Sequence, residues 1–382
     1  RDHLLGMSPK DYDIVTDAHP QQVKKVFGRS ARIIGRRFKL VHVRRGNECY
    51  EVSTFRRKPD PDERRAREDD DGVTLWRDNE YGTRKEDAFR RDFTVNAIMY
   101  DPFSKEKLVD YTGGLDDMEN GVVRAIGNPE LRLAEDPVRI LRALKLVAQY
   151  DFTLEPELEN ALRQRVETIH EASRSRLFEE LMKIFAKPYS AITFDVFAKY
   201  DFLDQYLPNL AAVWGKGATG ELMRDLMQER DRRKQAGTYW LSRRLALATL
   251  TLPAVAKQLT GNDEFDWWEY EHGIEKTARH EICRLLEPLP TPKALSHNAK
   301  DVILLLPRFD QEGHRKRLLH DHQYRWAREL FSILLSVMDW DKTILEKWPV
   351  DNGQRPPNRN KRRRPRGKHV KRSHKKEWDN PQ

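Results

Sequence analysis

The stretch Lys10-Asp11-Tyr12-Asp13-Ile14-Val15-Thr16 decides how this chain is interpreted, because it places two aspartates two positions apart at the start of a β-rich run. In an extended chain, residues i and i+2 point to the same face. Asp11 and Asp13 can therefore close on one divalent ion. The alternative is a surface turn in which the aspartates cap the backbone, and on spacing alone that use is the commoner one.

A third carboxylate, Glu51, lies in a second strand-like run, Tyr50-Glu51-Val52-Ser53-Thr54-Phe55-Arg56. The turn Arg45-Gly46-Asn47 precedes it, which predicts a hairpin with the β-rich stretch that ends at Val43. We expect this hairpin to bring Glu51 close to the two aspartates, with a helix over residues 20–27. Clustered carboxylates indicate a divalent cation that offsets their repulsion, and such ions serve phosphoryl or nucleotidyl transfer.

Two adjacent arginines lie ahead of an aspartate in the string Asp87-Ala88-Phe89-Arg90-Arg91-Asp92-Phe93-Thr94-Val95-Asn96-Ala97. Arginine pairs well with phosphate, and the threonine and asparagine that follow add groups able to bind a sugar. The string therefore predicts a short element that holds a phosphorylated ligand. In isolation, an exposed amphipathic helix explains it equally well.

A third string, Ala134-Glu135-Asp136-Pro137-Val138-Arg139-Ile140-Leu141-Arg142-Ala143, repeats a charged residue every three positions. On a helix, Asp136, Arg139 and Arg142 would share one face and present an acceptor and planar donors to the edge of a base. The same string is also an ordinary helix start, with Asp136 as the N-cap and Pro137 at the first helical position. The two interpretations are compatible.

The composition of the 382-residue chain, with 38% hydrophobic and 34% charged residues, fits a globular protein with polar appendages. No apolar run approaches the ~18 residues of a membrane-spanning helix. The two cysteines cannot form a disulfide framework, which indicates a reducing compartment. We therefore expect a cytoplasmic protein without a membrane partner.

The formal charge of +9 is concentrated near the C-terminus, where twelve basic and no acidic residues lie between Arg355 and Lys376. Proline and glycine interrupt this segment and apolar residues are few, so we predict disorder over residues 351–382. Such a segment binds polyanions, and the alternative is a solubilising tail. The predicted RNA-binding residues are Arg362, Arg363, Arg364 and Arg366.

The hydrophobic periodicity predicts an α+β protein with a small α/β head, an all-helical body after Asp87 and a loose basic tail. No period of 20 to 50 residues indicates a regular solenoid. The predicted helices of the body cover residues 137–149, 155–169, 176–186, 220–236, 239–250, 274–286 and 324–348.

These strings resemble, in their order along the chain, those of the bacterial poly(A) polymerases, within a nucleotidyltransferase superfamily that includes the bacterial-type CCA-adding tRNA nucleotidyltransferases. That family opens with Gly-Gly-x-Val-Arg-Asp-x-Leu-Leu-Gly, and this chain starts inside the string at Arg1-Asp2-His3-Leu4-Leu5-Gly6. We therefore expect a fragment that lacks its first residues, including the glycine turn that would cradle a triphosphate. The likeness is dense from Arg1 to about Ala186, and the strands between Gly35 and Arg56 resemble the poly(A) polymerases more than the CCA-adding enzymes.

The resemblance implies a polymerase-beta-like nucleotidyltransferase head of mixed sheet and helices. An RNA 3′ hydroxyl would attack the α-phosphate of ATP and release pyrophosphate, with two Mg²⁺ ions, or Mn²⁺ in their place. The implied metal ligands are Asp11, Asp13 and Glu51, and Asp92 is a further catalytic acid. The implied nucleotide-binding residues are Arg1, Asp2, Arg90, Arg91, Asn96, Asp136, Arg139 and Arg142.

The resemblance also implies the domains: a truncated head over residues 1–100, a helical neck over 101–190 that binds the nucleobase and RNA, a helical body over 191–350, and the tail over 351–382. The expected function is a poly(A) polymerase of RNA processing and decay, whose partners are ATP and the 3′ ends of mRNA or other RNA. The alternatives are a CCA-adding enzyme, since spacing does not separate ATP from CTP, and a catalytically silent RNA-binding protein. Clustered carboxylates argue against the silent protein, because a scaffold gains nothing from like charges held together.

Overall fold

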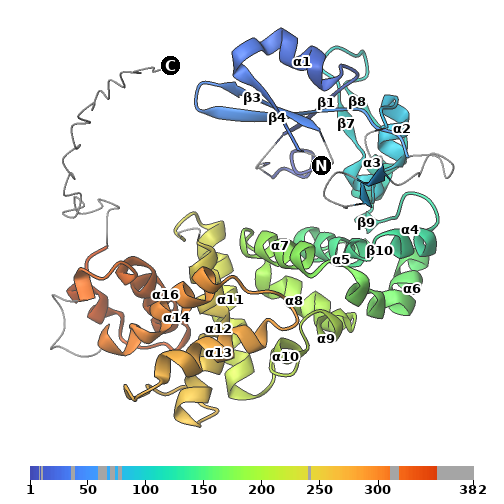
Figure 1. Ribbon diagram of the computed structural model, residues 1–382. Helices are drawn as coiled ribbons and strands as arrows, with labels where there is room; N and C mark the ends of the chain where they lie inside the picture. Colours follow the sequence, from blue (N-terminus) through green and yellow to red (C-terminus); the bar gives the residue numbers. More distant parts are fainter. Residues whose placement is uncertain are drawn as a thin grey trace, which may run out of the picture.

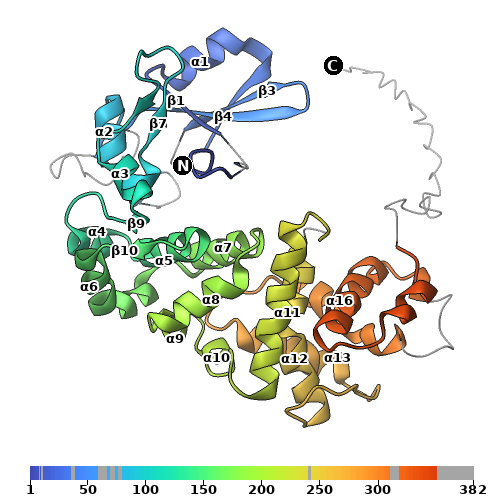
Figure 2. The same ribbon diagram turned by 180° about the vertical axis from the view of Figure 1, so that it is seen from behind.

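The computed structural model describes residues 1–7, 9, 12–35, 39–58, 67–68, 74–75, 80–239, 242–309 and 318–350. Two sets of predicted site residues lie outside this part of the chain: Asp11 of the aspartate pair, and the tail arginines Arg362, Arg363, Arg364 and Arg366. In both views the head lies apart from the helical body, and α5 (Val138–Tyr150) and α7 (Arg174–Phe185) run along the edge of the body that is nearest the head (Figures 1 and 2).

The head is built on a mixed four-stranded sheet with the order β1-β4-β3-β2. Its strands are β1 (Asp13–Thr16), β2 (Ala31–Ile34), β3 (Leu40–Arg45) and β4 (Glu48–Thr54). The β1 and β4 strands are parallel, and the other neighbouring pairs are antiparallel. The parallel pair needs a crossover, and α1 (Pro20–Phe27) provides its helix, over the residues that the sequence predicts.

Alternation along the strands decides which side chains face the core of the head. Val41 and Val43 of β3 and Val52 of β4 are buried with Val23 of α1, whereas Glu51, between Ser53 and Cys49 on the opposite face of β4, is exposed. The Gly46-Asn47 turn joins the two strands, and Arg45 pairs with Glu48 directly across it. The predicted hairpin is confirmed, and its register places Glu51 on the solvent side of the sheet.

The chain after Asp87 is less uniformly helical than the periodicity predicts. Two-residue strands form small ladders between the helices, and segments this short show no hydrophobic period in a sequence. They follow or flank α2 (Arg84–Phe89), α3 (Gly114–Glu119) and α4 (Pro129–Glu135). The additional strands are β7 (Met99–Tyr100), β8 (Leu108–Val109), β9 (Val122–Val123) and β10 (Thr153–Leu154).

The helical body contains the predicted helices at shifted bounds, and further helices that the periodicity missed. The helix expected over residues 239–250 begins at Arg243, and the one expected over 324–348 already ends at Val337. The predicted helices are α5 and α7 above, with α6 (Pro156–Arg165), α11 (Gly217–Gln235), α12 (Arg243–Thr260), α13 (Ile274–Leu285) and α16 (Tyr324–Val337). The missed helices are α8 (Ser190–Lys199), α9 (Phe202–Tyr206), α10 (Pro208–Ala211) and α14 (Lys293–Leu304).

The centre of the body is α12, which is buried on all sides from Leu245 to Ala256. A helix that is apolar all round needs neighbours on every face, and α11, α13, α14 and α16 supply them. The buried hydroxyls of Thr249 and Thr251 donate to the carbonyls four residues earlier, at 2.8 Å each. None of the described helices is both long and apolar enough to cross a membrane.

Candidate active site

Two of the predicted metal ligands lie side by side on the exposed face of the sheet. Asp13 opens β1 and is in direct register with Glu51 of the parallel strand β4, so both side chains project from the same face. Glu51 Oε1 lies 3.1 Å from His42 Nε2 of the neighbouring strand β3. The Asp13 carboxylate makes no hydrogen bond or ion pair to any residue that the structure describes. Parallel pairing therefore brings together two carboxylates that are 38 positions apart in the sequence.

This pair suits a hard divalent cation in its chemistry. Carboxylate oxygens are the ligands that Mg²⁺ and Mn²⁺ take up, and the Asp13 carboxylate has no cationic side chain beside it among the described residues. Asp13 and Glu51 supply two such groups, and Asp11 is the third in the predicted set. The described residues alone contain no cluster of three potential ligands.

Arg90 and Arg91 are both held by one buried carboxylate, that of Asp87 on α2. Asp87 Oδ1 accepts from Arg90 Nη2 at 2.6 Å, and Asp87 Oδ2 accepts from Arg91 Nη2 at 3.2 Å. Asp87 Oδ1 also accepts from the backbone N–H of Arg56, at 3.0 Å. Asp87 is fully buried, whereas its two arginines keep part of their guanidinium surface exposed. Asp87 opens the string found in the sequence, but no pattern there distinguishes it as the fixed centre of this group.

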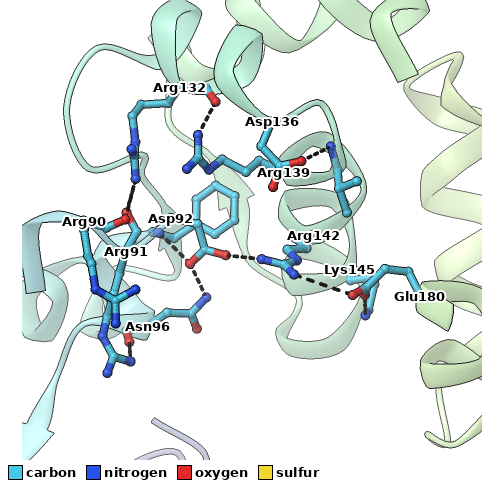
Figure 3. A network of polar contacts seen from close by, with 12 residues as sticks. Arg90, Arg91, Asp92, Asn96, Arg132, Asp136, Arg139, Arg142, Lys145 and Glu180 are labelled. Atoms are coloured by element: carbon cyan, nitrogen blue, oxygen red, sulfur yellow. Dashed lines mark hydrogen bonds and ion pairs between the residues drawn. The ribbon is translucent and has the colours of Figure 1, made fainter. Parts of the chain in front are cut away.

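Asp92 joins the head to α5, as Figure 3 shows. Its Oδ1 accepts from the backbone N–H of Phe93 at 2.9 Å and from Asn96 Nδ2 at 3.0 Å. Its Oδ2 lies 3.7 Å from Arg142 Nη1. The contact is long, so the Arg142 guanidinium keeps donors available for a ligand. The structure thus brings together Asp92, Asn96 and Arg142, which the sequence places in two separate strings.

Arg132 of α4 fixes the Arg90-Arg91 turn against the helices, a role that sequence reasoning missed. Its guanidinium donates to the backbone carbonyl of Arg90 at 2.8 Å and to that of Arg91 (Figure 3). Its Nη1 also donates to Glu135 Oε2, at 2.9 Å. Burial lowers the pKa of Arg132, with the positive charge of Arg139 adding to that effect. Because a guanidinium has five donors, one side chain can satisfy several acceptors of a turn.

Asp136, Arg139 and Arg142 were expected to share one face of a helix, and only the two arginines lie on that helix. Asp136 lies before α5 in an extended conformation, with φ −151° and ψ 97°, so it does not share a helical face with the two arginines. Its Oδ1 accepts from the backbone N–H of Val138 at 3.2 Å, as a helix-starting residue does, and its Oδ2 accepts from Arg176 at 2.8 Å. Arg139 Nη1 donates to Glu135 Oε2 at 3.2 Å, away from Arg142. Pro137, the next residue, explains the break, because the residue before a proline favours extended backbone.

Arg1 and Asp2 join the same site through Tyr150, at the end of α5. The Tyr150 hydroxyl donates to Asp2 Oδ1 at 2.5 Å, and the Arg1 guanidinium lies over the Tyr150 ring, 4.8 Å from its centre. Arg1 Nη1 also donates to Asn96 Oδ1. Burial works to raise the pKa of Asp2, but the hydrogen bond from Tyr150 and the charge of Arg1 outweigh it, and the pKa is lowered. Sequence reasoning missed Tyr150, which lies 148 residues from Asp2.

Comparison with known proteins decides the family. The family model for the poly A polymerase head domain matches residues 1–124, and the model described as the probable RNA and SrmB-binding site of polymerase A matches residues 151–213. Poly(A) polymerase I of Escherichia coli O6:H1 is 32% identical over 355 residues, which are 88% of this chain and 73% of that protein. The chain belongs to the bacterial poly(A) polymerase family.

Two further comparisons agree with this membership. Poly(A) polymerase I of Haemophilus influenzae is 40% identical over 214 residues, which are 56% of this chain, and the match spans about half of that protein, 47%. The fold is that of a CCA-adding enzyme from Bacillus stearothermophilus in complex with CTP, at a TM-score of 0.59 and 21% identity, over 91% of this chain and 75% of that one. The poly(A) polymerases are nucleotidyltransferases, and the predicted membership and fold class are confirmed.

In this member of the family, Glu180 of α7 forms ion pairs with several basic residues next to the site. Its carboxylate is almost fully buried and accepts from Lys145 at 2.8 Å, with Arg142 Nη2 at 3.8 Å (Figure 3). It also accepts from Lys183, at 2.7 Å. Burial opposes the charge on Glu180, but Lys145 and Lys183 prevail and lower its pKa to about 2. Glu180 therefore holds α5 and α7 together and positions Arg142 beneath Asp92.

The depressed pKa of Glu180 predicts an acid-dependent loss of stability. The carboxylate stabilises the fold above its ordinary pKa of 4.5, and the contribution is lost as the pH falls towards about 2. With a discount for solvent screening, it amounts to about 2 kcal/mol. We expect Glu180→Gln to lower the free energy of urea unfolding at neutral pH and to lose that difference in acid. The control is Glu179→Gln at the adjacent, exposed position; equal pH profiles for the two variants would contradict this role.

Proposed function

We propose that this chain adds AMP from ATP to the 3′ ends of RNA and releases pyrophosphate. The observation that carries the proposal is the register of Asp13 with Glu51 on the exposed face of the sheet, which supplies adjacent carboxylates on the head where the family's nucleotidyl transfer needs them. Residues 1–124 match the head of the family, and the E. coli relative aligns with 88% of the chain.

The residues of the site divide into those that hold a metal ion and those that hold the nucleotide. Asp13 and Glu51, with Asp11, would hold Mg²⁺, which when bound lowers the pKa of the attacking hydroxyl and neutralises the leaving pyrophosphate. Arg90 and Arg91 lie with part of their surface exposed beside Asp87, available to pair with phosphate oxygens.

We assign the binding of the base and of the sugar to the residues that join the head to α5. Among the described residues, the ion pairs of Arg142 are long, 3.7 Å to Asp92 and 3.8 Å to Glu180, so it can turn a donor towards an adenine edge. Asn96 is fixed by Asp92 and Arg1 near the same place, within reach of a ribose. Arg139 and Asp136 are already engaged by Glu135 and Arg176, so we assign them to the wall of the base pocket.

Labelled ATP and labelled CTP, each with Mg²⁺ and an unstructured RNA primer, test this proposal directly. We expect repeated AMP addition with ATP and little CMP addition. Efficient CMP addition to tRNA ends would replace the proposal by a CCA-adding enzyme, which the shared fold also allows. RNA binding without any incorporation would indicate a silent RNA-binding protein. A cytoplasmic location stays a prediction.

A further inference from the structure

A cavity of about 700 Å³ lies beside the site, between the first turns of α7, α12 and α14. Its polar wall contains Ser175, Arg243, Arg244 and Thr291, and its apolar wall contains Phe178 and Leu295. The α12 and α14 walls lie beyond both stretches that the family models match. We infer that this cavity holds one nucleotide of the RNA primer, upstream of the 3′ end, through its phosphate.

The polar wall has the groups that bind nucleic acid backbones. Proteins contact phosphates mainly with arginines, hydroxyl side chains, backbone N–H groups and helix N-termini, and all four meet here. No side chain caps the start of α7 or of α14, so their first N–H groups keep the partial positive charge of a helix start. The Thr291 hydroxyl oxygen is buried and has no hydrogen-bond partner among the described residues. Rotation of this side chain about χ1 towards the cavity would give the hydroxyl a phosphate oxygen as its acceptor.

The two arginines differ in how they are held. Arg244 Nη1 donates to Gln323 Oε1 at 3.0 Å, and Gln323 Nε2 in turn donates to Asn298 Oδ1 at 2.8 Å. Gln323 is fully buried, so this chain of contacts fixes the Arg244 side of the wall in advance. The Arg243 side chain is 63% exposed, and among the described residues its one ion pair is a 3.9 Å contact with Glu179, the one acidic residue of the described lining. Arg243 is therefore free to turn towards a phosphate.

The size and the apolar wall favour a nucleotide over a simple anion. A volume of 700 Å³ far exceeds the needs of a single phosphate, and lies in the range of pockets that hold small organic molecules. Phe178 is buried and Leu295 half-buried, so these side chains reach the cavity by their edges and form an apolar wall on which a ribose or the edge of a base can pack. The cationic wall matches the phosphate of a nucleotide, and the apolar wall matches its sugar or base.

Helix α7 connects this cavity to the catalytic network, which favours RNA over a free nucleotide. Ser175 and Glu179 share one face of α7 and line the cavity, while Arg176 and Glu180 share the neighbouring face and contact Asp136 and Arg142. Successive residues of a helix point about 100° apart, so the two places lie on adjoining faces of α7. A primer whose 3′ end lies beside Asp92 would therefore reach the cavity within a few nucleotides.

The inference rests on the proposed function, because it takes an RNA primer as the ligand, and its test separates the two. Binding of a fluorescent long oligoadenylate is measured for the full chain and for Arg243→Glu. We expect binding weaker by on the order of tenfold, and a salt dependence of log K that is shallower by about 0.7 for one lost phosphate contact. The control is Arg224→Glu on α11, where the 46% exposed arginine also contacts a single aspartate, Asp195. Equal binding by the two variants would overturn the inference.

Steady-state AMP incorporation provides the second arm. We expect Arg243→Glu to raise the KM for a long primer while leaving kcat, the KM for ATP and the KM for a dinucleotide primer unchanged. If the wild-type chain incorporated no AMP, the proposed function would fail, but the binding arm would still test the cavity. Competition by free AMP that abolishes the difference between wild type and Arg243→Glu would assign the cavity to a free nucleotide and overturn the inference.

A variant at a second position tests the cavity independently, in case Arg243→Glu does not fold. Ala294 is exposed in the first turn of α14 and lines the cavity. Ala294→Glu places a carboxylate at a helix start, where negative charge is favourable, so the fold should keep its thermal stability. The same carboxylate would repel a phosphate, and RNA binding should weaken as for Arg243→Glu. Ala294→Gln adds a side chain of the same length without charge and should bind RNA more tightly than Ala294→Glu; equal affinities would contradict an anion site.

Discussion

Asp13→Asn is expected to reduce AMP incorporation more than the ~10–100-fold typical for the loss of a second-sphere partner, because Asp13 is proposed to be a metal ligand itself. The substitution keeps the size of the side chain but takes away the negative charge beside Glu51. Residual activity should need more Mg²⁺ for half-maximal rate, since one anionic ligand is gone.

The stability and the RNA binding of this variant should stay close to those of the wild type, because Asp13 is exposed and contacts no described side chain. Asp17→Asn is the matched control, at an exposed aspartate just beyond the same strand. Activity of Asp13→Asn within a few-fold of the Asp17→Asn value, at the same Mg²⁺ concentration, would remove Asp13 from the catalytic set and with it the main support for the proposed function.

Asp87→Asn is expected to destabilise the head by about 3 kcal/mol, at the low end of the range for breaking a buried ion pair, because its two arginines are partly exposed. The amide that replaces the carboxylate turns an N–H₂ group towards guanidinium donors in a fully buried place, so donors face donors. The one oxygen that remains carries no charge and can no longer accept from Arg90, Arg91 and the backbone N–H of Arg56 together.

Thermal and urea unfolding, followed together with AMP incorporation, measure this effect. Activity should fall even at temperatures where the variant stays folded, because the arginines assigned to the phosphates are no longer fixed. The control is Asp116→Asn, at an exposed aspartate of α3 whose side chain makes no hydrogen bond or ion pair to any residue that the structure describes. A change in unfolding free energy no larger for Asp87→Asn than for this control would show that Asp87 does not organise the site.

The sheet of the head and its carboxylates follow closely from the sequence. The helix over residues 20–27, the Gly46-Asn47 hairpin and the strand that carries Glu51 form as predicted. These features depend on contacts between near neighbours and on alternation with period two, which a single sequence displays. The register also fixes which face Glu51 occupies, because a slip of one residue would bury it.

The sequence was less reliable where helices are short or lack an amphipathic stripe. The segments of α8, α9 and α10 gave no distinct period, and the two-residue strands gave none at all, whereas α14 was missed although it is amphipathic. Asp136 was expected on a helical face, yet the following proline keeps it outside α5. Such outcomes depend on burial by distant parts of the chain and on local backbone limits, which outweigh periodicity.

By itself, then, the sequence determined the kinds of groups that act here: paired carboxylates, adjacent arginines and the strings typical of a nucleotidyltransferase. Only the tertiary structure decided which of them meet and which are already engaged. Arg132 reaches a turn some 41 residues earlier, Tyr150 reaches Asp2 across 148 residues, and the cavity between α7, α12 and α14 joins three distant segments. The physical reason is that hydrogen bonds and ion pairs act over a few ångströms in space, whereas a sequence records only distance along the chain.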